Sequence, residues 1–153
     1  MNQTILQIDQ ELRELTNAHN QVKSYYYGDF LSILKKSIEY TCVMANISNA
    51  SRVSDQLVRL NLDLFVCDKT LKGDENKLYV ENQTLQILID ICNVIAYAPK
   101  WQSFGVVTVN PNFRKYYDRT ADIVTGWSGT FSIDIKSPIG YCDLPIFNYN
   151  YES

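Results

Sequence analysis

The sequence lacks the residue clusters that most metal and redox sites require. It contains a single histidine, His19, and its four cysteines are so far apart that no Cys-x-x-Cys pair occurs. Structural zinc sites and thiol redox motifs both depend on such closely spaced ligands. We therefore expect no metal ion and no cofactor, and we expect Cys42, Cys67 and Cys92 to be reduced, buried thiols within apolar segments.

Long apolar runs and an excess of positive charge are also missing. No segment approaches the roughly 20 apolar residues of a membrane span, and the N-terminal sequence MNQTILQIDQELREL carries charges where a secretory signal is apolar. The formal net charge is −3, which gives no broad attraction for phosphate backbones or anionic lipid. These absences predict a soluble protein with no membrane partner and no specific nucleic-acid binding.

What the sequence does contain indicates one globular domain spanning residues 1–153. Apolar residues make up 46% of the chain, which is enough to build a core, and 11 tyrosines supply side chains that can be half buried. Apolar residues spaced three and four apart predict a helix over residues 5–22. His19 lies on this apolar stripe, so we expect a structural histidine that hydrogen-bonds to Tyr27 or Asp29.

The middle of the chain predicts two paired strands and a second helix. Residues 38–47 are apolar on both faces and residues 58–66 alternate, so two antiparallel strands are expected on either side of a polar turn at residues 48–51. A charged, exposed loop is expected at residues 68–77. Asn82 is expected to cap a helix that runs to the next proline and covers one face of the sheet.

The last third of the chain predicts further strands. Residues 104–109 form a short β-branched strand, and the sequence FRKYYDR is expected to form one helical turn. Residues 122–136 alternate so regularly that one long strand is expected, in which Gly126 and Gly129 mark a bulge or a close backbone approach. The tail from about residue 141 is rich in Tyr, Asn and Phe and is expected to be extended. The predicted fold class is α+β, with a mixed, mainly antiparallel sheet flanked by two main helices.

The aromatic residues and the long strand provide more apolar surface than two helices can cover in a domain of this size. Copies of the same protein are the simplest cover, because head-to-tail contacts between unlike surfaces can close into a ring. The alternative is that the tyrosines only cover the core of their own chain. The predicted subunit interface comprises Tyr25, Tyr26, Tyr27, Asp29, Trp127, Phe131, Phe147, Tyr149 and Tyr151.

Acidic residues gather in the loop before the second predicted helix. Asp68, Asp74 and Glu75 do not follow the alternating ligand pattern of a calcium loop, so they are interpreted as solvated charges. A small hydrolase that uses these acids is an alternative. Because the sequence contains no nucleophile elbow and no glycine-rich phosphate cradle, we expect a protein that is not an enzyme.

Three sets of residues carry a family resemblance. They are residues 19–25 with Gly28-Asp29, residues 62–68 leading through Asp74-Glu75-Asn76 into the helix TLQILIDI, and Gly126-Trp127-Ser128. Together they resemble small tail and neck proteins of tailed bacteriophages, including the crAss-like and other Bacteroidetes phages. The resemblance implies a tail terminator or head-to-tail connector, in which a mixed sheet backed by helices forms a ring around the DNA channel. It implies no catalytic residues.

On this resemblance the protein is expected in the virion, at the neck or tail, after assembly in the cytoplasm of a bacterial host. Its expected partners are copies of itself, neighbouring portal-side and tail tube proteins, and DNA that passes through the lumen without specific binding. Asp68, Asp74 and Glu75 are expected to face that channel, because a strongly basic lumen would retain DNA. A non-virion tail assembly chaperone or adaptor is the alternative function.

Overall fold

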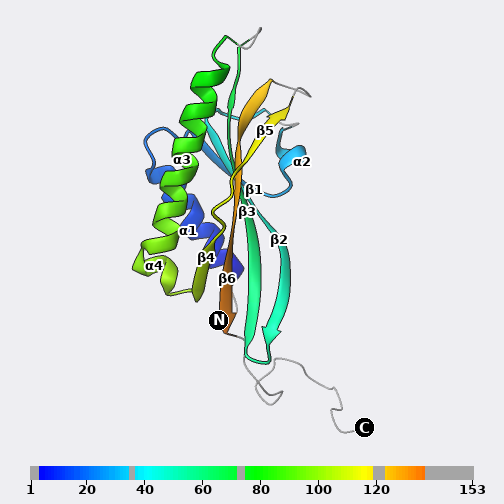
Figure 1. Cartoon of the computed structure of the whole chain (residues 1–153), viewed down its shortest axis with the longest axis vertical. Helices are drawn as coiled ribbons and strands as arrows, with labels where there is room; N and C mark the ends of the chain where they lie inside the picture. Colours follow the sequence, from blue (N-terminus) through cyan, green and yellow to red (C-terminus); the bar gives the residue numbers. More distant parts are fainter. Residues whose placement is uncertain (1–3, 35–36, 72–74, 119–122, 137–153) are drawn as a thin grey trace.

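A computed structural model describes residues 4–34, 37–71, 75–118 and 123–136 of the chain. Within these residues, helices and strands are interspersed along the sequence (Figure 1). In order, they are α1 (Thr4–Ala18), β1 (Ser24–Tyr27), α2 (Phe30–Leu34), β2 (Cys42–Ser54), β3 (Leu57–Lys69), α3 (Lys77–Tyr97), α4 (Pro99–Gln102), β4 (Val106–Val109), β5 (Arg114–Asp118) and β6 (Val124–Lys136).

The strands form one sheet in the order β1-β2-β3-β6-β4, and β5 also pairs with β6. β1 runs parallel to β2, and every other pairing is antiparallel. With α1 and α3 as its two main helices, the structure confirms the predicted α+β class with a mixed, mainly antiparallel sheet. The predicted antiparallel pairing of the two middle strands is also confirmed.

The three longest strands, β2, β3 and β6, form the centre of the sheet. β3 pairs with β6 along its whole length, from Leu57 opposite Lys136 to Lys69 opposite Val124. At Gly126 an added Cβ atom would overlap the carbonyl oxygen of Val66, so this position tolerates only glycine without a backbone shift. The close backbone approach predicted there is therefore confirmed.

The first face of the sheet is covered by α1, α3 and α4, which all lie on the same side in Figure 1. Alternate residues of β3 point into this layer, as expected for a strand with one buried face. The residues of this main core include Ile8, Leu12, Val43, Leu60, Leu62, Leu64, Ile87, Leu88, Ile91, Trp101, Phe131 and Ile133.

The second face carries a smaller core under the short helix α2. It is built around Phe65, whose ring stacks on Phe30 at 5.3 Å and meets the edge of Tyr116 at 4.6 Å between ring centroids. Cys42 and Cys67 belong to this core, and their Sγ atoms lie 3.2 Å apart. The thiols of Cys42, Cys67 and Cys92 are free and buried, as the sequence predicts, and burial raises the pKa of the Cys67 thiol.

The ends of the two main helices differ from the prediction. α1 ends at Ala18, and the residues after it form a turn that leads into β1. α3 begins at Lys77, so the predicted cap Asn82 was wrong and this residue lies inside the helix. The reason is that Val80 is already buried against the sheet, which extends the packed face upstream. The helix ends just before Pro99, as predicted.

Three short segments form strands that the sequence patterns did not predict as strands. β1 follows the predicted first helix and was given no strand, β5 was expected as a helical turn, and residues 48–51 were expected as a turn. The hairpin turn actually lies at Asp55-Gln56. In each case an existing neighbour supplies the pairing, because β2, β6 and β3 present backbone groups that these segments bond.

Candidate subunit interface

Tyr25, the first residue of the predicted interface, is part of the core. Its side chain is 6% exposed, and its hydroxyl group donates a 2.7 Å hydrogen bond to Oδ1 of Asp9 on α1. The guanidinium of Arg13 lies 5.0 Å from the centre of its ring. Burial, and then the bond to Asp9, raise the pKa of the phenol well above its ordinary value. The prediction that Tyr25 offers contact surface is corrected: it fastens α1 to β1.

The neighbours of Tyr25 divide between the two sides of the sheet. Tyr26 packs against the smaller core on the second face. Tyr27 is 40% exposed, and its hydroxyl group accepts a 3.2 Å hydrogen bond from the backbone N–H of Ile47. The carboxylate of Asp29 accepts bonds from the backbone N–H and the hydroxyl group of Ser32, at 3.3 and 2.9 Å, so it caps the start of α2. Of these residues, Tyr27 and Asp29 are exposed and available to a partner.

The aromatic residues of β6 face the helices. Phe131 is 2% exposed and meets the ring of Trp101 edge-on at 6.0 Å. The indole N–H of Trp127 donates a 2.9 Å bond to the carbonyl oxygen of Glu81 on α3. Phe131 is therefore already covered within one chain, which corrects its assignment to an open contact surface, whereas Trp127 is half-buried against the main core. The other predicted aromatic residues, Phe147, Tyr149 and Tyr151, lie outside the described residues.

The predicted channel-facing loop is shorter than expected. Asp68 lies within β3, and its carboxylate accepts bonds from the hydroxyl group of Thr41 at 2.9 Å and the backbone N–H of Lys69 at 2.7 Å. This corrects its placement in a loop, because the bonds hold the side chain against the sheet. Glu75 is exposed in the turn before α3, and Asp74 lies outside the described residues.

A long unpaired edge on β2 was not recognised in the sequence. β1 covers only residues 42–45 of this strand, and the bond from the backbone N–H of Gly28 to the carbonyl oxygen of Ala45 ends that pairing. In the described part of the chain, no strand lies beside residues 46–54 on that side. Side chains 48–54 are exposed. The signal was present as a polar run without proline, but it was interpreted as a turn.

The edge belongs to a hairpin that extends beyond the helices at the lower end of Figure 1. On the second face of the sheet, this end carries polar side chains from β3 and β6. Arg59 and Asp134 lie opposite each other there and form a two-pronged ion pair, with N–O distances of 2.7 and 2.9 Å. Further along β3 on the same face, burial raises the pKa of the Asp63 carboxyl. This polar face binds no helix within the described residues.

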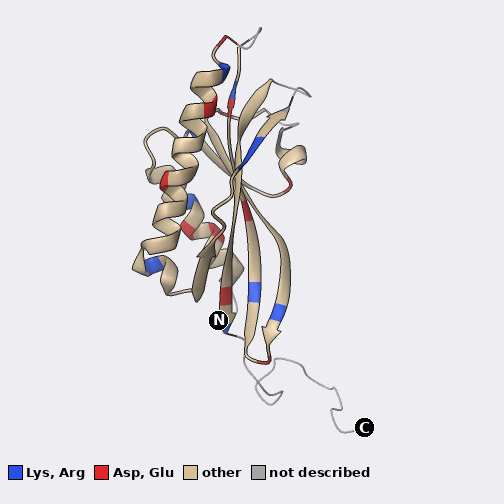
Figure 2. Cartoon of the chain, viewed as in Figure 1, with Lys and Arg blue, Asp and Glu red and all other residues tan. Residues whose placement is uncertain are grey.

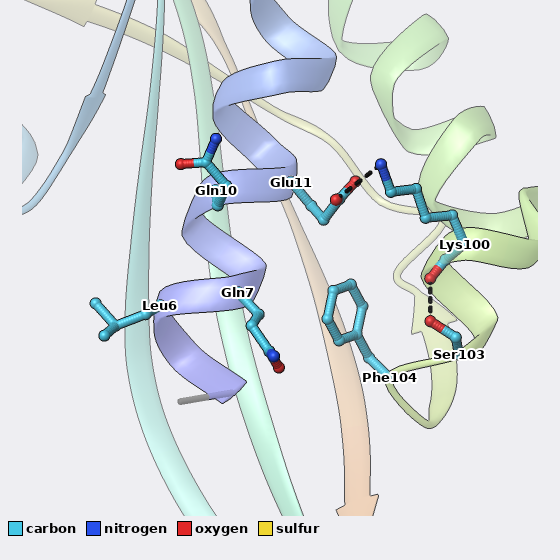
Figure 3. A pocket seen from close by; sticks show the side chains of 7 residues that line it. All are labelled: Leu6, Gln7, Gln10, Glu11, Lys100, Ser103 and Phe104. Atoms are coloured by element: carbon cyan, nitrogen blue, oxygen red, sulfur yellow. Dashed lines mark hydrogen bonds and ion pairs between the residues drawn. The ribbon is translucent and has the colours of Figure 1, made fainter. Parts of the chain in front are cut away.

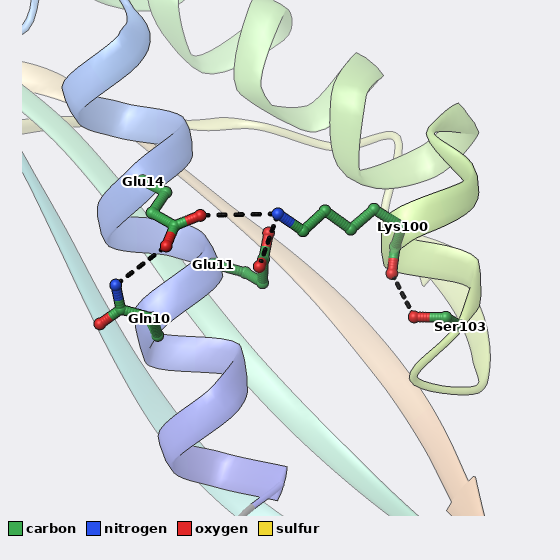
Figure 4. A network of polar contacts seen from close by, with 5 residues as sticks. All are labelled: Gln10, Glu11, Glu14, Lys100 and Ser103. Atoms are coloured by element: carbon green, nitrogen blue, oxygen red, sulfur yellow. Dashed lines mark hydrogen bonds and ion pairs between the residues drawn. The ribbon is translucent and has the colours of Figure 1, made fainter.

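A groove of about 540 Å³ lies between α1 and α4, and Figure 3 shows the side chains that line it. Its polar groups bond to each other (Figure 4): the ammonium group of Lys100 lies 2.9 Å from Oε1 of Glu11 and 3.5 Å from Oε2 of Glu14. A bond from Gln10 and the charge of Lys100 lower the pKa of Glu14. These contacts join α4 to α1, so the groove is explained as part of the fold.

The single histidine also has a structural position. Nε2 of His19 lies 3.1 Å from Oδ2 of Asp90 on α3. The predicted bond to Tyr27 or Asp29 was wrong, because β1 carries those residues away from α1 while α3 packs beside it. No group of three metal-binding side chains gathers among the residues that the structure describes.

Comparisons with known proteins add no family assignment. No protein family model matches the chain, and no curated protein matches its sequence. Among the described residues, none of the helices has the length and apolar character needed to cross a membrane.

Proposed function

We propose that the protein is a ring-forming subunit of a bacteriophage neck or tail, a tail terminator or head-to-tail connector that joins the portal side to the tail tube. The observation that supports this proposal best is the unpaired edge of β2 on a projecting hairpin. An edge strand presents unpaired backbone N–H and C=O groups, which soluble monomers usually block. A binding partner is the simplest reason to keep such an edge open.

The distribution of surfaces supports a ring rather than a symmetric pair. The β2 edge lies on one side of the sheet, and β4 and β5, which pair with successive parts of β6, form the opposite edge. β4 spans only Val106–Val109, and Pro111 soon follows with no N–H to donate. Since the two edges differ, a contact of the β2 edge with another surface of the next copy joins unlike surfaces, and such contacts close into rings when the rotation between copies divides a full turn.

The charge distribution is compatible with DNA passing through the ring. Acidic and basic side chains are interspersed over the described elements, as Figure 2 shows. The net charge of −3 gives no overall attraction to phosphate. A lumen with interspersed charges and no excess of positive charge lets DNA slide, because few phosphates are neutralised and few counterions are released on contact.

Mass spectrometry of purified phage particles tests the proposal directly. The protein should be found in mature virions together with portal and tail tube proteins, and electron microscopy of the assembled chain should show closed rings with a central opening. Its absence from mature particles, combined with its presence in assembly intermediates, would favour the alternative of a tail assembly chaperone or adaptor.

A further inference from the structure

The β2 edge has one apolar and one polar face. In the pairing with β3, Ile47 lies opposite Leu62 and Ala50 opposite Leu60, and both β3 residues belong to the main core. Asn49 lies opposite Asn61 on the polar face, and residues directly opposite each other point to the same side. A strand added beside β2 would therefore place large apolar side chains over Ala50 and polar ones beside Asn49.

Apart from the hydrogen bond of the Ile47 backbone N–H to the Tyr27 hydroxyl group, little protects this edge from pairing. Residues 46–54 contain no proline, and Arg52 is their only charged side chain. Register irregularities occur between Ile47 and Asn49 and between Arg52 and Ser54, but residues 49–52 between them remain in regular register. Val53 adds an exposed apolar side chain near the end of the strand. Natural edge strands are usually blocked by charge, proline or short length, and this one is not.

The last residues of the chain have the matching pattern. After Pro145, the aromatic residues Phe147, Tyr149 and Tyr151 alternate with Asn148, Asn150 and Glu152. Alternation of aromatic and polar side chains is the signature of a strand with two unlike faces. Residues 146–153 contain no proline, and this segment of eight residues is close in length to the open edge of residues 46–54.

The register of the sheet brings this segment to the correct end of the molecule. β2 and β6 are both antiparallel to β3, so they run in the same direction. Lys136 at the end of β6 lies opposite Leu57, and Leu57 lies opposite Ser54 at the end of β2. The residues 137–145 that follow can reach at most about 30 Å, which is enough to leave the hairpin and meet an adjacent copy.

We propose that residues 146–153 of one copy add as a strand to residues 46–54 of β2 in the neighbouring copy. The choice of a neighbour rests on the proposed function, because a ring requires each copy to offer a segment to one neighbour and an edge to the other. Backbone hydrogen bonds provide the pairing, and the aromatic side chains cover the apolar border beside Ala50. This segment replaces Tyr25 and Phe131 as the aromatic contribution to the interface.

Photo-crosslinking with the full chain tests the strand addition without assuming its register. The photoreactive residue p-benzoylphenylalanine replaces Tyr149. Protein produced with the light isotope of nitrogen is mixed with protein produced with the heavy isotope before irradiation. Mass spectrometry should find crosslinks from position 149 to residues 46–54, in pairs of peptides that combine the two isotopes. Crosslinks confined to one isotope would show pairing within a copy and overturn the proposal, as would crosslinks to another region or none.

A matched pair of variants tests the edge itself. Ala50→Lys places a charge on the open edge and should reduce the crosslink yield by about tenfold, because charged side chains block edge pairing. Asn93→Lys adds the same charge on the exposed side of α3 and should leave the yield unchanged. Equal effects of the two variants would contradict the proposal. Circular dichroism confirms that both variants remain folded.

Different results would overturn the strand addition and the proposed function. Crosslinks to the β2 edge in a protein that is absent from virions would overturn the neck or tail function and leave the strand addition intact. A protein found in virion rings whose position 149 crosslinks elsewhere would overturn the strand addition alone.

Discussion

The hydroxyl group of Tyr25 donates a part-buried hydrogen bond to Asp9 that helps to join α1 to the sheet. The variant Tyr25→Phe keeps the ring in the core but removes the hydroxyl group. The carboxylate of Asp9 then loses this hydrogen bond. We expect a loss of about 1 kcal/mol in the free energy of unfolding, measured by urea denaturation. Tyr97→Phe is the control, because Tyr97 is largely exposed at the end of α3 and its change should be close to zero. Equal losses would contradict the role of the Tyr25 hydroxyl group.

The ion pair between Arg59 and Asp134 makes stability depend on pH. The hydrogen bonds from Arg59 lower the pKa of Asp134 below the ordinary aspartate value, although burial opposes them. A carboxyl group with a lowered pKa stabilises the fold fully above its unfolded pKa of about 4, and that contribution disappears as the pH falls through the lower folded value.

Asp134→Asn should therefore lower the urea midpoint near neutral pH, and its difference from the natural chain should shrink towards about pH 2 to 3. Asp55→Asn, in the exposed hairpin turn, is the control and should show no such convergence. A constant difference for Asp134→Asn across this pH range would show that the charge of Asp134 does not carry the effect.

At the scale of elements, Asn76 organises the approach to α3. Its side-chain oxygen accepts a 2.7 Å bond from the backbone N–H of Leu71, while Asn82 is exposed inside the helix. Asn76→Ala should lower the free energy of unfolding by about 1 kcal/mol, because it leaves this N–H without its partner. Asn82→Ala should raise it by a few tenths of a kcal/mol, because alanine is the better helix former. Thermal or urea unfolding of both variants checks the opposite signs.

Elements with long regular patterns could be predicted from the sequence. The alternation through Leu60, Leu62 and Leu64 predicted β3, and the similar pattern of residues 124–136 predicted β6. Such patterns persist because each strand buries one whole face against α1, α3 and α4. The apolar face of α3 and its end at Pro99 were predicted for the same reason.

Elements that depend on a neighbour could not be predicted. β5 has the sequence RKYYD, whose charges give no strand pattern, and it is a strand because β6 supplies a partner for it. β1 and residues 48–54 of β2 follow the same rule. Pairing partners distant in sequence override local preference, which is why short strands are weakly encoded.

The candidate interface was predicted only in part for a related reason. Composition showed that aromatic residues were abundant, but it gave no means to tell which face of the chain each one occupies. Tyr25 and Phe131 became core residues because α1 and α4 lie over them. The open edge of β2 is defined by the absence of a neighbouring strand in the described structure, and the polar run of residues 48–51 was interpreted as a turn instead of an exposed edge.

At the scale of the whole molecule, the two cores share the same strands. Phe65 points into the smaller core and its neighbour Leu64 into the main core. A substitution that weakens the packing on one face therefore also destabilises the other face, because both depend on β3. Phe65→Ala and Leu88→Ala, on opposite faces, should each lower the free energy of unfolding by about 3 kcal/mol. Both should shift one common transition.

This common transition is measured by following urea unfolding with tryptophan fluorescence and far-ultraviolet circular dichroism. Trp101 and Trp127 contact the helices on the first face, so fluorescence reports the main core. The two signals should coincide in the natural chain and in Phe65→Ala. Separate transitions in Phe65→Ala would show that the smaller core unfolds independently.

The position of β3 between β2 and β6 also determines the order of events at the ribosome. β2 and β3 emerge one after the other and can pair as a hairpin at once, whereas β6 emerges only after the whole of α3 and β5 has been synthesised. During that interval β3 has one side without its final partner. A nascent chain is therefore exposed to wrong pairing until β6 has left the ribosome, and a pause in synthesis between β3 and β6 would lower its yield.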